Sequence, residues 1–172
     1  MNEGVNNILS RRSIRSFKSD KVLKSDLEII MECAVNAPSA RNTQKWKFTV
    51  IQNPEILNKL VKAMGNARND PNYGIYNANV LILASNERDY KFAAEDCSCA
   101  LENIFLAANA LGLGSVWINK LQDNCDIPEI RKILDEAKVP ANHIVIGSAA
   151  IGYINTPANK IAKRKDAVEW IL

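Results

Sequence analysis

Three arginines and two serines gather near the start of the chain, in the sequence RRSIRSF of residues 11–17, called here the arginine segment. The guanidinium groups of Arg11, Arg12 and Arg15 could each hold a phosphate through two parallel hydrogen bonds, and the Ser13 hydroxyl could add another. The same cluster could instead be a solvated basic helix end. A nucleic-acid site is less well supported, because no basic stripe with interleaved aromatic residues follows. The segment is therefore a candidate phosphate site.

A second polar segment, APSARNTQKW at residues 37–46, lies between an expected helix and an expected strand and is called here the polar loop. Small residues at Ser39 and Ala40 would let the backbone approach a flat ligand closely. Asn42 and Gln44 each offer an amide donor and acceptor, which suits a ligand edge of carbonyls and ring nitrogens. Alternatively, these amides could satisfy the loop's own backbone.

Two other segments could bind an anion or a ring. The sequence LGLGSVWI at residues 111–118 follows an expected helix and lacks the third glycine of a dinucleotide fingerprint, so its glycines could simply form a tight turn. Residues 160–165 carry three lysines and Arg164. That basic tail could be a mobile terminus, although the apolar residues 170–172 favour burial of the end.

The four cysteines do not indicate a metal site. Cys33, Cys97, Cys99 and Cys125 are expected to be free thiols, and Cys97 and Cys99 would point apart on a helix. His143, which is the only histidine, begins an apolar strand and is expected to be structural. Because no Ser-His-Asp or Cys-His pairing is evident, we expect no side-chain nucleophile and no metal.

Apolar periodicity and capping residues predict helices that alternate with strands, as in an α/β sandwich. We expect strands at 46–52, 80–85, 115–119 and 143–154. Helices are expected at 2–10, 25–37, 53–65, 90–111 and 126–138, separated by a polar loop at 66–77. Ser25 with Glu28, Asn53 and Asp126 are the expected N-terminal caps, and Gly112 is the expected C-terminal cap. The helix at 90–111 is apolar around much of its circumference, which indicates a central or interfacial position.

The bulk composition agrees with one globular domain over residues 1–172. The chain is 47% hydrophobic and 24% charged, and its net charge of +3 excludes general polyanion binding. Because the sequence shows neither a secretory signal nor a membrane-spanning stretch, we expect a cytoplasmic protein without membrane or nucleic-acid partners.

The four segments, in this order and spacing, resemble the nitroreductase family of FMN flavoenzymes over nearly the whole chain. RRSIRSF looks like the family's phosphate-side motif, APSARNTQKW like its helix-end loop, LGLGSVWI like its flavin-edge turn and KRKDAVEWI like its closing segment. The resemblance implies an α+β fold, a three-layer sandwich with a central, mainly antiparallel sheet flanked by helices. It also implies a domain-exchanged homodimer with FMN at the interface, touched by both subunits.

Carried onto matching positions, the resemblance implies FMN contacts from several parts of the chain. The arginine segment and Arg164 would hold the phosphate and ribityl chain, the polar loop would come from the partner subunit, and residues 114–118 would lie near the ring. Asn66 is a weaker match to an asparagine that meets the ring. The implied FMN-binding residues are Arg11, Arg12, Ser13, Arg15, Pro38, Ser39, Ala40, Asn42, Gln44, Asn66, Gly114, Ser115, Trp117, Ile118 and Arg164.

The implied activity is hydride transfer from NAD(P)H through FMN to a small electron acceptor such as a nitroaromatic or a quinone. The chain departs from the family at Lys45, where a proline is usual, and at Asn119 and Lys120, where a glycine often follows. These departures bear on substrate choice. A non-enzymatic flavin-binding sensor or carrier is the main alternative. A flavin-dismantling or dehalogenating enzyme is less well supported, because the chain shows no lid insertion.

Overall fold

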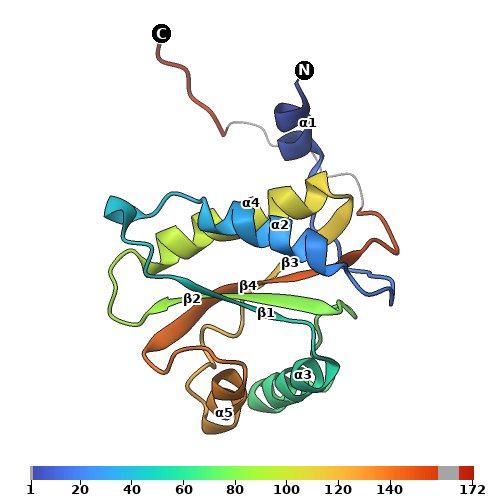
Figure 1. Ribbon diagram of the computed structural model, residues 1–172, viewed down its shortest axis with the longest axis vertical. Helices are drawn as coiled ribbons and strands as arrows, with labels where there is room; N and C mark the ends of the chain where they lie inside the picture. The colour runs from blue at the N-terminus through green and yellow to red at the C-terminus, as the bar shows by residue number, and fades with distance from the viewer. Residues whose placement is uncertain (1, 159–166) are drawn as a thin grey trace.

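The computed structural model describes residues 2–158 and 167–172 and shows a four-stranded sheet between two layers of helices (Figure 1). The strand order is β1-β2-β4-β3, and each of the three strand pairs is antiparallel. The strands are β1 (Lys47–Ile51), β2 (Val80–Glu87), β3 (Leu113–Ile118) and β4 (His143–Tyr153). Antiparallel pairing means that the alternating helices and strands build an α+β fold, as the family resemblance implied, and not the α/β sandwich expected from alternation alone.

The helices divide between the two faces of the sheet (Figure 1). One face is covered by α2 and α4, and the other by α3 and α5, while α1 lies beyond one end of α4. A 3-10 turn, η1, lies within the polar loop. Their bounds are α1 (Glu3–Ser10), α2 (Lys24–Val35), η1 (Ala40–Asn42), α3 (Pro54–Arg68), α4 (Ala93–Ala110) and α5 (Pro128–Glu136).

Two hydrophobic cores lie on opposite faces of the sheet, one with α3 and α5 and the other with α2 and α4. Strand β2 contributes to both, because its alternate side chains point to opposite faces. Leu81 and Leu83 pack into the first core, whereas Val80, Ile82 and Ala84 pack into the second. The apolar run at 80–85 therefore lies buried on both sides, as its sequence predicted.

Two expected helix caps are wrong. Helix α2 begins at Lys24 with Leu23 as its N-cap, so Ser25 already lies inside the first turn. Asp126 does not cap α5, whose N-cap is Ile127. Instead, the Asp126 carboxylate forms a two-bond ion pair with Arg88, with both N···O distances 2.7 Å. At Asp126, the ion pair with a residue 38 positions earlier competes with the local capping pattern.

The cap of α3 is confirmed, but its end is not where the sequence predicted. Asn53 Oδ1 accepts hydrogen bonds from the backbone N–H groups of Glu55 and Ile56 at 2.9 and 3.2 Å. The helix then continues past Gly65 to Arg68, because Asn69 takes the left-handed conformation that closes it. The loop that was predicted to begin at residue 66 therefore begins three residues later, at Asn69.

Helix α4 begins at Ala93, three residues later than expected, and Gly112 follows its end with a φ of +74°. Gly112 thus has the terminating role that the sequence predicted, since glycine adopts this backbone conformation without strain. Across the described residues, no helix is long and apolar enough to cross a membrane.

Candidate functional site

The arginine segment lies directly on the sheet, beside strand β3. Ser13 forms a parallel bridge with Ser115, and the Ile14 N–H donates to the Ser115 carbonyl at 2.9 Å. Phe17 forms a second bridge, antiparallel, with Ile154 just past the end of β4. The structure therefore brings together two predicted site segments, residues 11–17 and 111–118, that are about 100 residues apart in sequence.

The three arginines differ in what their side chains do. Arg12 Nη1 donates to the backbone carbonyls of Leu9 and Arg11, both at 2.7 Å, and so closes the C-terminal end of α1. Arg11 Nε lies 3.7 Å from Glu102 Oε1 with its side chain 27% exposed. The exposed Arg15 guanidinium lies over the ring of Tyr76, 6.0 Å from its centroid. Arg11 and Arg15 are thus reachable by an anion, while Arg12 serves its own helix.

The neighbouring β3 residues offer backbone and one aromatic ring to such a site. Ser115 and Ile118 are buried, with 2% and 9% of their surface exposed. Trp117 is 37% exposed, its ring centroid lies 5.9 Å from that of Phe105, and its Nε1 donates to Asn119 Oδ1 at 3.2 Å. Among residues 115–118, Trp117 is therefore the side chain with an accessible surface.

The polar loop is held by residues at the N-terminal end of α4. The backbone N–H of Ala40 donates to Asp96 Oδ1 at 2.8 Å, and Asp96 is 2% exposed. The Tyr90 hydroxyl donates to the Ala40 carbonyl at 3.3 Å and lies 2.7 Å from Thr43 Oγ1. Lys45 Nζ pairs with Glu87 Oε2 at 2.5 Å, which neutralises the charge that replaces the family's proline.

Within the loop, three residues other than glycine adopt positive φ angles: Arg41 at 56°, Asn42 at 54° and Gln44 at 49°. Such conformations are uncommon and cluster at functional loops, where the surrounding contacts hold them. Gln44 Nε2 donates to Asn42 Oδ1 at 2.7 Å, and the Gln44 N–H donates to Ser39 Oγ at 3.2 Å. In these bonds the exposed side-chain amides of Asn42 and Gln44 pair with each other, while the loop backbone is bonded by the Ser39 hydroxyl.

Within the chain, the polar loop and the arginine segment lie near opposite ends of α4 (Figure 1). Asp96, in the first turn, binds the loop. Asn109, in the last turn, donates to Asn7 Oδ1 and to Ser10 Oγ at 2.7 and 2.9 Å, just before the arginines. The thirteen-residue step from Asp96 to Asn109 corresponds to about 20 Å of helix. The structure thus brings the two halves of the predicted site to different places in the same chain.

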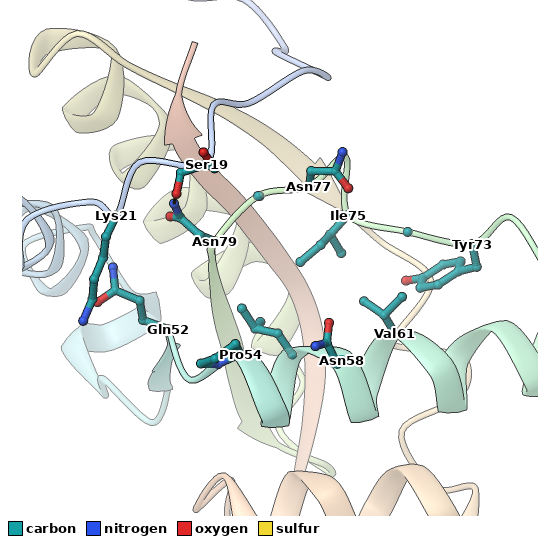
Figure 2. Close-up of a pocket in the computed structure, with 13 residues that line it drawn as sticks. Ser19, Lys21, Gln52, Pro54, Asn58, Val61, Tyr73, Ile75, Asn77 and Asn79 are labelled. Carbon is teal, nitrogen blue, oxygen red and sulfur yellow. Dashed lines mark hydrogen bonds between the residues drawn. The ribbon is translucent and has the colours of Figure 1, made fainter. Parts of the chain in front are cut away.

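A pocket that the sequence did not indicate lies between α3 and residues 73–79, with a volume of about 650 Å³ (Figure 2). Lys21 and Gln52 lie at one end of it and Tyr73 at the other, with Asn58 and Asn79 between them. The high frequency of asparagine in residues 66–79 is the sequence feature that could have suggested this pocket.

Asn66 and Arg164 are the two remaining predicted site residues. Asn66 is exposed near the end of α3, where its carbonyl accepts the N–H of Asn69, and it lines a second hollow with Tyr73. Arg164 lies outside the described residues.

Among the described residues, the titratable groups with shifted pKa values lie outside the arginine segment, the polar loop and residues 111–118. Burial raises the pKa of the Cys97 thiol to about 12, and Cys99, two residues on, is exposed on another face of α4. Burial also lowers the pKa of His143, whose Nδ1 lies 3.2 Å from Ser85 Oγ. All four cysteines are free, and the described residues contain no group of three histidines, cysteines or acids that could hold a metal ion.

Comparison with known proteins agrees with this architecture. The model of the "Nitroreductase family" matches residues 8–72 and 65–153. A relative from Archaeoglobus fulgidus, provisionally named an NADH dehydrogenase/NAD(P)H nitroreductase, is 34% identical over 156 residues, which is 89% of this chain and 86% of the relative. An "FMN reductase [NAD(P)H]" from Bacillus subtilis is 26% identical over 95% of this chain and 70% of its own.

Solved structures match as well. A nitroreductase with bound FMN from Bacteroides fragilis superposes with a TM-score of 0.94 at 32% identity, covering 99% of this chain and 100% of its own. A nitroreductase with bound FMN from Desulfitobacterium hafniense shares the fold with a TM-score of 0.89 at 23% identity, covering 99% of each chain. With the sheet order, the docked arginine segment and these matches in agreement, the chain belongs to the nitroreductase family.

Proposed function

We propose that the protein is an FMN-dependent oxidoreductase that transfers a hydride from NAD(P)H to a small electron acceptor such as a nitroaromatic or a quinone. The observation that supports the proposal is the pairing of the arginine segment with Ser115 of strand β3, the strand that also carries the accessible Trp117. When bound, FMN would supply the hydride chemistry, and the protein would supply binding and orientation.

The donor set fits a phosphate monoester. Arg11 and Arg15 supply accessible guanidinium groups and Ser13 a hydroxyl between them, which is the combination that binds phosphate oxygens by charge-assisted hydrogen bonds. We assign the phosphate to these three residues, with Arg164 as a further expected contact. Arg12 is the least suited member of the predicted set, because its guanidinium already holds α1 carbonyls.

We further propose a homodimer in which the polar loop of one subunit completes the site of the other. The separation of the loop from the arginine segment along α4 supports this, because one chain alone does not bring the two halves together. Apolar side chains that a partner could cover are exposed on α1 and α2, namely Val5, Ile8, Leu9, Ile29 and Val35. A single domain over residues 1–172 and a cytoplasmic location stay predictions.

The first test is spectroscopic. Purified protein reconstituted with FMN should show the yellow flavin spectrum and should bleach under anaerobic conditions on addition of NADH or NADPH. Protein that stays colourless with added FMN would contradict the proposal. Flavin binding without reduction by either nicotinamide would instead identify a sensor or carrier.

The second test uses subunit complementation. One variant, R11A/R15A, lacks the phosphate donors, and the other, N42A/Q44A, lacks the loop amides. In a shared site, each variant alone has two damaged sites, whereas a mixed dimer regains one intact site. Mixed and refolded subunits should therefore recover FMN binding and NAD(P)H oxidation toward one site per two dimers. No recovery in mixed dimers isolated with two different tags would show that the loop and the arginines do not share a site.

A further inference from the structure

A rung of the sheet without side chains lies beneath the arginine segment. Gly114 on β3 and Gly152 on β4 are partners in the antiparallel ladder, and both are buried. A Cβ atom added to Gly114 would lie 2.9 Å from Ile14 Cβ, and one added to Gly152 would lie 3.0 Å from Phe17 Cδ1 and 3.2 Å from Phe17 Cβ. At Gly114 a larger residue would force Ile14 to move, and at Gly152 it would require Phe17 to shift by a few tenths of an ångström.

The glycines face the core formed with α3 and α5. Because side chains alternate along a strand, Gly114 shares a face with Val116 and Ile118, and Gly152 shares a face with Ala150. All three of these residues belong to that core, as do Ile14 and Phe17, which are 5% and 6% exposed. Ile14 and Phe17 thus fill the end of the core where the two strands offer no side chains.

Backbone hydrogen bonds hold the segment on both sides of Arg15. The Ile14 N–H donates to the Ser115 carbonyl at 2.9 Å, and the Lys18 N–H donates to the Tyr153 carbonyl at 2.9 Å. Between these points, Ile14 and Phe17 point inward while Arg15 is exposed. The direction of Arg15 is therefore set by two inward anchors whose depth depends on the glycines.

We propose that Gly152, together with Gly114, is a positioning residue for phosphate recognition: the bare rung fixes the height and direction of the arginine segment over the sheet. This inference rests on the proposed FMN function. The inference gives Gly114 a role in packing the arginine segment, in addition to the expected approach to the FMN ring. It also adds Gly152, which was not among the predicted site residues.

Gly152→Ala tests the proposal without touching a predicted FMN contact. Affinities for FMN and for riboflavin, which has the same ring but no phosphate, are measured by flavin fluorescence. The added methyl group should lift Phe17 and displace the arginines. The FMN dissociation constant should then rise about tenfold, equivalent to about 1.4 kcal/mol, while riboflavin affinity changes less than about twofold. An unchanged FMN preference, or an equal loss for both ligands, would overturn the proposal.

Two further variants separate positioning from general destabilisation. Leu134→Ala removes a fully buried side chain of α5 from the same core and should lower the free energy of unfolding without changing the preference for FMN over riboflavin. Phe17→Leu combined with Gly152→Ala removes the ring that the new methyl group meets and should recover part of the preference. If the double variant does not recover the preference for FMN, the contact between Phe17 and Gly152 does not position the arginines.

If Gly152→Ala does not fold, Phe17→Ala tests the same packing contact by removing the Phe17 ring that lies against Gly152. An unchanged FMN preference in that variant overturns the proposal. Failure of the wild-type protein to bind either flavin would instead reject the proposed function itself. A wild-type preference for FMN that survives Gly152→Ala rejects only the role of the glycine.

Discussion

The adjacent arginines Arg11 and Arg12 make different contacts in this protein. Arg12 donates to two carbonyls at the end of α1, whereas Arg11 makes a looser ion pair with Glu102 and stays partly exposed. A guanidinium whose donors already bind the backbone must give up those bonds before it can bind a ligand, so identity and spacing alone overstate the number of phosphate contacts. The structure thus ranks Arg11 above Arg12 as a ligand.

Arg11→Ala is expected to weaken FMN binding by about 1.5–3 kcal/mol, the value of a hydrogen bond to a charged group. Fluorescence titration at fixed ionic strength measures the loss. Arg12→Ala is the matched control, since it removes the same charge one residue away. We expect it to weaken FMN binding less and to destabilise α1. Equal losses in both variants would mean that only the summed charge matters.

The lowered pKa of the buried His143 predicts how the free energy of unfolding depends on pH. It is 7% exposed, and because Ser85 Oγ donates to the Lys47 carbonyl, His143 Nδ1–H is the donor to that hydroxyl. Burial lowers the pKa of His143 from the ordinary 6.5, so the unfolded chain takes up its proton first as the pH falls. The contribution to stability is therefore present above about pH 6.5 and is lost below it as the pH approaches the folded-state pKa.

Urea denaturation of the wild type and of His143→Gln, over about pH 5 to pH 7, checks this dependence. The variant should show a flatter decline in the free energy of unfolding on acidification than the wild type. Parallel curves would show that the histidine is equally accessible to protons in both states.

At the scale of elements, α4 links the polar loop to α1 and the arginine segment within one chain. Its first turn fixes the polar loop through Asp96, and its last turn bonds α1 through Asn109. Asp96 is buried, and its Oδ1 accepts the Ala40 N–H in a charge-assisted bond that helps hold the left-handed residues of the loop. The helix thus holds the polar loop and the arginine segment apart within one chain.

Asp96→Ala should lower the free energy of unfolding by about 1.5–3 kcal/mol, because the Ala40 N–H loses its charged acceptor. Asp96→Asn keeps an oxygen acceptor and should lose less. Glu95→Ala is the control, since Glu95 lies in the same helical turn but is exposed, and it removes the same favourable charge at the helix N-terminus. If Glu95→Ala costs as much as Asp96→Ala in urea denaturation, the bond to Ala40 contributes little.

For the whole molecule, the exposed apolar residues of α1 favour a second copy as their cover. Helix α1 has no buried residue, and its apolar side chains Ile8 and Leu9 are 58% and 57% exposed. A charge at Ile8 should disfavour a dimer by leaving an ion in an apolar interface. Ile8→Glu is therefore expected to sediment as a monomer and to lose FMN affinity.

Ile127→Glu is the matched control, because Ile127 is a partly exposed isoleucine just before α5 and should leave both properties unchanged. FMN-loaded wild type should sediment at twice the mass of the single chain. A monomeric, FMN-loaded wild type would contradict a cofactor shared between subunits.

The sequence predicted most elements, because apolar periodicity reports directly on which side of an element is buried. It placed β2 in both cores, gave α3 its Asn53 cap and gave α4 its Gly112 terminus. It failed at Ser25, which lies inside the first turn of α2, and at Asp126, whose carboxylate binds Arg88 and does not cap α5. It also missed Asp96, because one acid in an apolar helix does not reveal a backbone partner 56 residues earlier.

The sequence by itself thus determined which segments are present, namely a candidate phosphate-binding residue set, a polar loop and a glycine-containing segment, and the family to which they belong. These are properties of short segments and their order, which composition and spacing encode. The tertiary structure alone decided that Ile14 and Phe17 seat the arginines on the Gly114–Gly152 rung, that Arg12 serves its own helix, and that α4 separates the loop from the arginines. Those outcomes depend on contacts between residues far apart in sequence, where packing and backbone pairing select one arrangement from many that local patterns permit.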